Sequence, residues 1–171
     1  MCQDYQGDTQ AAREFFQQTQ AKLVHAVTSM TPSEVVMERS DSGAGNMGLR
    51  SWPNDNIRRN DVTVSKNYLA EAEIRELNRL TTILLDIFED QAELGRLVVM
   101  ADARRLLDDQ LRGLGRTVLG GGGRVSAEAA KEKALREYDA WKDRQKALRH
   151  EQADAVIAEL AAVARRGKRR G

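Results

Sequence analysis

The feature that most constrains this 171-residue chain is an apolar stripe in the segment 69–94. Apolar side chains return there every three or four residues, the spacing of one helix face; they are Ile74, Leu77, Leu80, Leu84, Ile87 and Phe88. A helix of this kind must bury its apolar face against other elements. The segment therefore predicts a long helix at the centre of a packed domain.

Four further segments repeat apolar residues at helical spacing, and together they predict an all-α single domain of about five helices. The additional helices are expected at residues 9–30, 32–39, 101–119 and 126–164. No segment predicts a strand convincingly. Residues 41–60 lack helical spacing, and we expect a long ordered loop there because Trp52 is a side chain that is normally at least partly buried.

Several helix ends carry recognisable signals. Thr31 suits the N-cap, Pro32 suits the first helical position, and Glu34 can bond back to the cap, which is the pattern of a capping box. Ser126 is the expected cap of the last helix. Gly95 is placed to end the central helix, because glycine readily adopts the left-handed conformation found after helix ends.

The two ends of the chain are expected to differ from the helical domain, which covers residues 9–164. Residues 1–8 are polar and are expected to be disordered. The last helix begins with a regular stripe, which comprises Ala134, Tyr138, Trp141 and Leu148. Its apolar positions then drift to Val156, Leu160 and Val163, so its end is expected to protrude or to pack on another chain. Residues 165–171 form a basic tail.

Composition limits the class of protein and its environment. Aromatic residues make up only 5% and charged residues 31%, which favours helices with an aliphatic core and a charged surface. The net charge of +1 supplies no strong overall field for nucleic acid. The single cysteine, Cys2, and the absence of a secretory signal favour a cytoplasmic location. No window approaches 18 apolar residues, so no membrane span is expected.

Four basic residues in and near the loop are candidates for contact with an anion or nucleic acid, namely Arg50, Arg58, Arg59 and Lys66. The guanidinium group matches phosphate geometry, and a helix beginning near Asp61 would add unpaired backbone N–H groups. The favoured alternative is that these side chains are solvated or paired with acids of the central helix, as surface arginines commonly are.

The segment 46–52, with the sequence NMGLRSW, also allows two interpretations. It is either a functional loop or a packing segment in which Met47, Leu49 and Trp52 cover the end of the core. Methionine and tryptophan are valuable chiefly for the area that they bury, so the packing interpretation is favoured.

No set of residues points to catalysis, a cofactor or a metal. Neither His25 nor His150 has another ligand residue nearby at metal spacing. The acidic residues between 86 and 93 lie on successive turns, but a di-metal site would need Glu-x-x-His motifs, so a solvated face is favoured. The glycine-rich run 113–126 lacks the Gly-Lys-[Ser/Thr] of a phosphate loop and is interpreted as a linker.

Three segments resemble the C-terminal half of the RhuM virulence-protein family of bacteria: NMGLRSW, RRNDVTVSKNYLAEAEIRELNRL and DIFEDQAE. The upstream EFFQQTQAKLVHAVTSMTPSEVVMERSD and the downstream GGGRVSAEAAKEKALREYDAW are similar to the same family, so the resemblance covers about residues 13–142. NMGLxSW followed by DVTxxKNYL is specific, because amphipathic helices do not produce it by chance. The signature residues are Asn46, Met47, Gly48, Leu49, Ser51, Trp52, Asp61, Lys66, Asn67 and Tyr68.

The resemblance implies an association with virulence and mobile elements and no established biochemical activity. Full members carry an N-terminal region similar to a DNA-binding helix-turn-helix, and without it this chain is expected to be a truncated or split member. The run LLDDQLRGLGRTVLGGGG departs from the family, because an aromatic-rich helix is expected there.

We expect a non-catalytic module for protein interaction or self-association, with another protein or a second copy as partner. The expectation rests on the resemblance, the drifting stripe of the last helix and the lack of a catalytic set. One alternative is a nucleic-acid-binding accessory domain that uses the loop arginines and the basic tail. Another is an unrecognised enzyme that uses residues 46–66.

Overall fold

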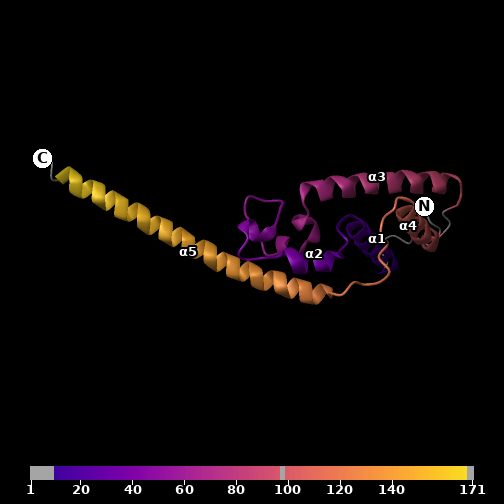
Figure 1. The fold of residues 1–171 in the computed structure, drawn as a ribbon, viewed down its shortest axis with the longest axis horizontal. Coiled ribbons are helices and arrows are strands. Elements are labelled where there is room, and N and C mark those ends of the chain that lie inside the picture. The colour runs from indigo at the N-terminus through magenta and orange to yellow at the C-terminus, as the bar shows by residue number, and fades with distance from the viewer. Residues whose placement is uncertain (1–9, 97–98, 169–171) are drawn as a thin grey trace.

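The computed structural model describes residues 10–96 and 99–168. The prediction for residues 1–8 lies outside the described residues, and so do most side chains of the predicted basic tail, 165–171. Across the described residues the chain forms α-helices and short 3₁₀ turns without a strand, which confirms the predicted all-α fold. The helices are α1 (Gln10–Thr28), α2 (Pro32–Arg39), α3 (Glu71–Glu93), α4 (Met100–Gly113) and α5 (Ala127–Lys168). Figure 1 shows α1 to α4 gathered at one end, with α5 extending away from them.

The start of α2 is the predicted capping box. The Thr31 hydroxyl accepts from the Glu34 backbone N–H at 3.3 Å, and the Glu34 carboxylate accepts from the Thr31 N–H at 2.7 Å. The same carboxylate accepts from the Arg124 N–H at 2.9 Å. These hydrogen bonds, led by the one from the Thr31 backbone, lower the pKa of Glu34. One carboxylate thus joins the start of α2 to the connector that leads into α5.

Both α3 and α4 end with a glycine in the left-handed conformation. After α3 this is Gly95, with φ of 69°, as predicted. After α4 it is Gly115, with φ of 70°, and the Arg116 N–H donates to the Leu111 carbonyl at 2.8 Å. The predicted helix 101–119 is therefore too long. Gly115, four residues after the buried Leu111, adopts the left-handed conformation, and α4 ends at Gly113.

The core consists of two clusters. The first gathers α1, α2, the segment 47–69 and the start of α5, and its fully packed members include Val24, Val35, Met47, Val62, Tyr68 and Ala134. The second lies between α1, α3 and α4 and contains Ala26, Leu80, Leu84, Leu107 and Leu111. Ile74 and Leu77 of α3 pack against the first cluster, so α3 joins the two, in agreement with its predicted central place.

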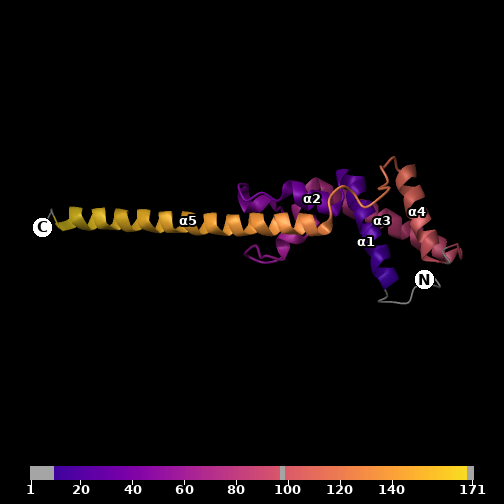
Figure 2. The same ribbon diagram turned by 90° about the horizontal axis from the view of Figure 1, so that it is seen from below.

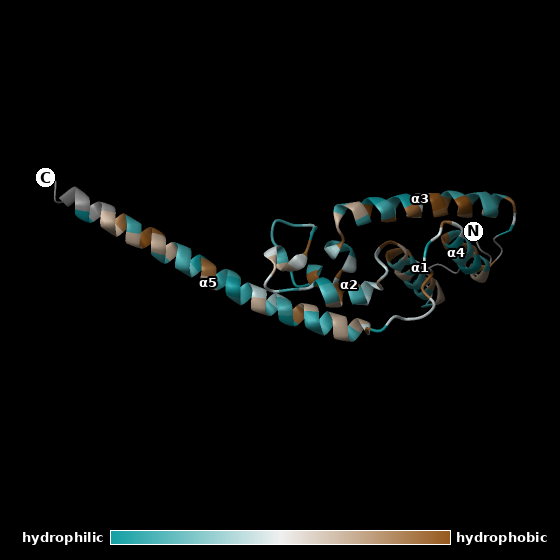
Figure 3. Ribbon diagram, in the orientation of Figure 1, coloured by the Kyte–Doolittle hydropathy of each residue, from teal (hydrophilic) through white to brown (hydrophobic). Residues whose placement is uncertain are grey.

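The longest helix is α5, with 42 residues. Its first part packs on the domain through Ala130, Ala134 and Tyr138, whereas the described side chains after Gln145 are exposed. Leu148 is among the exposed residues, so the prediction that it continues the buried stripe is wrong, because no other described element reaches that far along the helix. Figure 2 shows the same separation from a second direction, and Figure 3 shows that apolar residues continue into the projecting part.

Across the described residues, none of the helices combines the length and the apolar run that a membrane crossing requires.

Candidate functional site

The backbone of the signature segment turns through three consecutive left-handed residues. Asn46, Met47 and Gly48 have φ angles of 53°, 59° and 80°. Residues other than glycine rarely adopt this backbone conformation. At Gly48 a Cβ atom would lie 2.1 Å from the backbone carbonyl oxygen of Arg39, at the end of α2. The close approach of these two backbones therefore requires glycine at position 48.

This turn buries the apolar residues of the segment. Met47 and Leu49 are in the core, and Trp52 is partly buried against the first cluster. These positions agree with the packing interpretation of NMGLRSW. Of the other signature residues, Asp61 and Tyr68 are buried, Gly48 and Asn67 are partly buried, and Asn46, Ser51 and Lys66 are exposed.

The two halves of the signature are bound to each other through backbone groups. The Arg50 and Ser51 N–H groups both donate to the Asn67 carbonyl oxygen, at 2.7 and 3.1 Å. The Asn67 side-chain amide donates to the Asp61 carbonyl at 2.9 Å, and the Asp61 carboxylate accepts from the Arg58 N–H at 2.7 Å. The side chains of Asp61 and Asn67 thus fix the conformation of the loop.

Three charged side chains of α5 hold the segment that follows α2. The Lys133 ammonium donates to the carbonyls of Met37 and Ser40, at 2.6 and 2.8 Å. These carbonyls lie at the end of α2, where a positive charge is favourable. Glu137 accepts from the Ser42 N–H at 2.7 Å, and Arg144 donates to the Ser42 carbonyl at 2.6 Å. The hydrogen bonds from Ser42 lower the pKa of Glu137.

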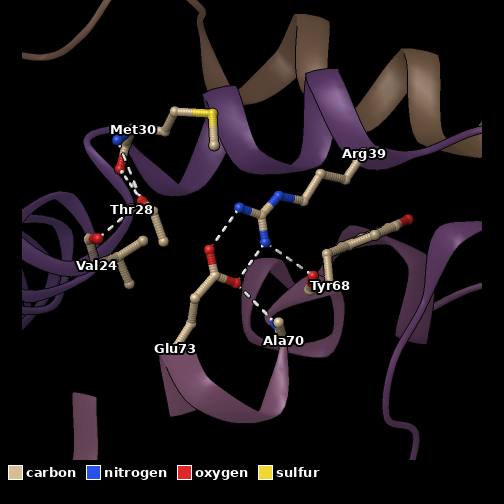
Figure 4. Close-up of polar contacts among 7 residues, drawn as sticks. All are labelled: Val24, Thr28, Met30, Arg39, Tyr68, Ala70 and Glu73. Atoms are coloured by element: carbon tan, nitrogen blue, oxygen red, sulfur yellow. Dashed lines mark hydrogen bonds and ion pairs between the residues drawn. The ribbon is translucent and has the colours of Figure 1, made fainter. Parts of the chain in front are cut away.

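A forked ion pair joins α2 to the start of α3 (Figure 4). The Arg39 guanidinium binds both oxygens of Glu73, at 2.6 and 2.7 Å, and also donates to the Tyr68 carbonyl at 3.1 Å. Glu73 further accepts from the Ala70 N–H at 2.7 Å. These bonds, led by those from Arg39, lower the pKa of Glu73, and the nearby charge of Arg50 acts in the same direction. Burial raises the pKa of the Tyr68 hydroxyl.

The four basic residues predicted to contact an anion are all exposed. Arg59 forms an ion pair with Asp139 of α5 at 2.7 Å, rather than with an acid of α3. Within the part of the chain that the structure describes, Arg50, Arg58 and Lys66 form no ion pair. The helix expected near Asp61 is only a three-residue 3₁₀ turn, Asp61–Thr63, so few N–H groups are added.

The remaining candidates stay separate from one another. His25 is partly buried, with Nδ1 3.4 Å from the Thr117 carbonyl oxygen, and His150 is exposed on α5. Among the described residues, no three acidic, histidine or cysteine side chains gather as a metal site would require. An open groove of about 810 Å³ runs between α1, α4 and the glycine connector, and it contains the Lys22–Asp108 ion pair. Sequence reasoning did not anticipate this groove.

A further surface is the distal part of α5, residues 146–168, which we call distal α5. Val156, Ile157 and Leu160 are 55%, 63% and 64% exposed there. They lie three and four residues apart, so they form one side of the helix. The drift of apolar positions in the sequence signals this surface, and the structure shows that no other described element covers it.

Comparison with known proteins identifies one relationship. The model of the virulence protein RhuM family matches residues 1–149, a range wider at both ends than the resemblance at residues 13–142. The searches of curated proteins and of solved structures found no match. A family match over most of the chain, together with the NMGLRSW loop and its partner segment around Asn67, leads to one conclusion. This chain belongs to the virulence protein RhuM family.

Proposed function

We propose that this RhuM-family chain is a non-catalytic module for protein interaction or self-association, and that distal α5 is its contact element. The observation that carries the proposal is the exposure of Val156, Ile157 and Leu160 on a helix that leaves the domain. The first part of the same helix is anchored by Ala134 and Tyr138, so the exposed side is presented from a fixed base.

The energetics favour a partner for this surface. A helix in water is stabilised mainly by packing of its apolar face, and distal α5 has no such packing within the described chain. Full burial of one aliphatic side chain contributes about 1.5–3 kcal/mol. Because these three side chains are already partly covered, burying them would contribute about 3 kcal/mol in total. Alone, this contribution corresponds to a dissociation constant above about 1 mM, so association in the micromolar range requires further contacts beside the three side chains.

Sedimentation velocity tests the proposal on the full chain, from about 10 µM to about 500 µM, the range suited to a weak interface. We expect concentration-dependent association that is lost in the double variant Ile157→Ser/Leu160→Ser. The matched control is Ala147→Ser/Ala158→Ser, which changes two exposed residues on the other side of distal α5 and should associate normally. A strict monomer at every concentration would refute self-association.

A second candidate function is nucleic-acid binding. Arg50, Arg58 and Lys66 favour it, because they are exposed and form no ion pair with the described residues. Side chains of this kind bind phosphates by releasing counterions, so the affinity should fall steeply with salt. Fluorescence anisotropy of a labelled DNA duplex, titrated at several salt concentrations, tests it. We expect Arg50→Ala/Arg58→Ala to reduce the salt dependence, and the absence of binding at low salt would reject this function.

A further inference from the structure

A surface that matches distal α5 in chemistry lies on the same chain, at the C-terminal end of α3. We propose that distal α5 of one copy docks on the C-terminal end of α3 of a second copy, so that the copies associate head to tail. This inference rests on the proposed function and names the partner and the surface that distal α5 contacts.

The receiving surface combines exposed apolar and acidic residues. Leu85 and Leu94 are 61% and 56% exposed. The acidic residues of the last turns of α3 are exposed as well, and they are Asp86, Glu89, Asp90 and Glu93. Helical spacing places Leu85, Glu89 and Glu93 in one row, because each is four residues from the next. The row therefore offers an apolar contact beside negative charge.

Among the described residues, no basic side chain pairs with the acids at this helix end. The last turn of α3 contains no basic residue, and its acidic side chains form no ion pair with the described residues. The C-terminal end of a helix carries partial negative charge, so acids at this position are unfavourable unless cations approach. A basic partner would remove this repulsion.

Distal α5 supplies the complementary groups. Arg149 lies seven residues before Val156, and Lys146 lies eleven residues, about three turns, before Ile157, so both basic residues share the side of the apolar stripe. Arg165 follows the stripe and begins the basic tail. The apolar stripe is therefore bordered by positive charge at its start, and Arg165 adds a further cation beyond Leu160.

This arrangement disfavours pairing of two copies of distal α5 with each other. In a parallel pair Arg149 would face Arg149 of the other copy, and in an antiparallel pair centred on the stripe it would lie near Arg165 of the other copy. Docking within one copy is also excluded by position, because distal α5 and the end of α3 lie at opposite ends of the molecule (Figures 1 and 2). The partner surface must belong to another copy.

Head-to-tail contact joins two different surfaces, so each added copy leaves one of each unused. Association of this kind continues beyond a dimer, or closes only as a ring, whereas a symmetric contact stops at two copies. The wild-type chain should therefore sediment as a series of species that grows with concentration.

The decisive experiment mixes two full-length variants, each lacking one surface. The tip variant is Ile157→Ser/Leu160→Ser, and the acceptor variant is Glu89→Lys/Glu93→Lys. Lysine near the end of α3 agrees with the helix dipole, so the acceptor variant should keep its fold; circular dichroism checks its helix content. Leu85→Ser provides a second acceptor variant that leaves the charge unchanged. The charge-reversal control is Asp55→Lys/Asp143→Lys, at two exposed acids away from both surfaces and from helix ends.

We expect the tip and acceptor variants to be monomeric alone, with association at least tenfold weaker than wild type. Each variant retains the surface that the other lacks, so their mixture should form a dimer that does not grow further. Association of the acceptor variants at wild-type strength would overturn head-to-tail docking and leave self-association through distal α5 intact. Two monomeric variants that form no mixed dimer would also overturn it. A wild-type chain that is monomeric throughout would overturn both proposals.

Discussion

Replacing Gly48 with alanine tests the account of the signature loop most directly. Gly48 has φ of 80°, and a Cβ there would lie 2.1 Å from the Arg39 carbonyl oxygen. Real Cβ contacts essentially never fall below 3.0 Å, so the loop or the end of α2 must move by at least 0.9 Å, the difference between the two distances. Both are backbone segments in the first core cluster, so neither yields easily.

The expected cost has two parts. An alanine in the left-handed conformation costs about 1 kcal/mol relative to glycine. The forced shift weakens the bonds from the Asp41 N–H to the Met47 carbonyl and from the Leu49 N–H to the Asn46 carbonyl, each worth about 1 kcal/mol. We therefore expect Gly48→Ala to lower the free energy of unfolding by about 3 kcal/mol and Tm by about 6–12 °C for a chain of this length.

Urea and thermal unfolding, followed by circular dichroism, measure this effect. The matched control is Gly45→Ala, three residues earlier in the same turn. Gly45 is not left-handed, and a Cβ there meets nothing within 4 Å, so its substitution should change stability by less than about 0.5 kcal/mol. Equal stability of the two variants would refute the argument that close backbone approach selects glycine at position 48.

Two further outcomes follow from buried polar contacts. Tyr68→Phe removes the donor to the Val62 carbonyl, a bond of 2.8 Å, and should cost about 1 kcal/mol in urea titrations; an unchanged midpoint would contradict this. In the folded state the pKa of Glu73 lies below its ordinary value of 4.5. Its pairing with Arg39 therefore stabilises the fold at pH values above 4.5, and this stabilisation is lost as the pH falls through the folded pKa. We expect stability to fall below about pH 4.5 and Glu73→Gln to flatten that fall; an equally steep fall in the variant would contradict this pairing.

The parts of the fold that could be predicted are those set by neighbouring residues. The capping box at Thr31 and the glycine stop after α3 were predicted correctly, because each involves only a few consecutive residues. The burial of Met47 and Leu49 followed from the large apolar area of such side chains. The match to the RhuM family was likewise carried by short local motifs.

Contacts between distant segments were not predictable in this way. Nothing near Lys133 in the sequence indicates that its ammonium caps α2, since its acceptors lie more than ninety residues away. The stripe on α5 predicted which side is apolar, but a stripe does not show whether another element covers it, so Leu148 was misassigned. The left-handed turn at Asn46 and Met47 escaped prediction because methionine rarely adopts that conformation, although asparagine does so more often than most residues.

The continuity of α5 has a mechanical consequence. From Ala127 to Arg166 the helix contains neither glycine nor proline, the residues at which helices most often bend. When a partner covers its apolar side, distal α5 is therefore a stiff rod about 35 Å long, at 1.5 Å for each residue. Lys133, Glu137 and Arg144 clamp its base to the loop after α2, so both the reach and the direction of the rod are fixed by the folded domain. Anything bound at its tip is held at a set distance from the signature loop, as on a rigid spacer.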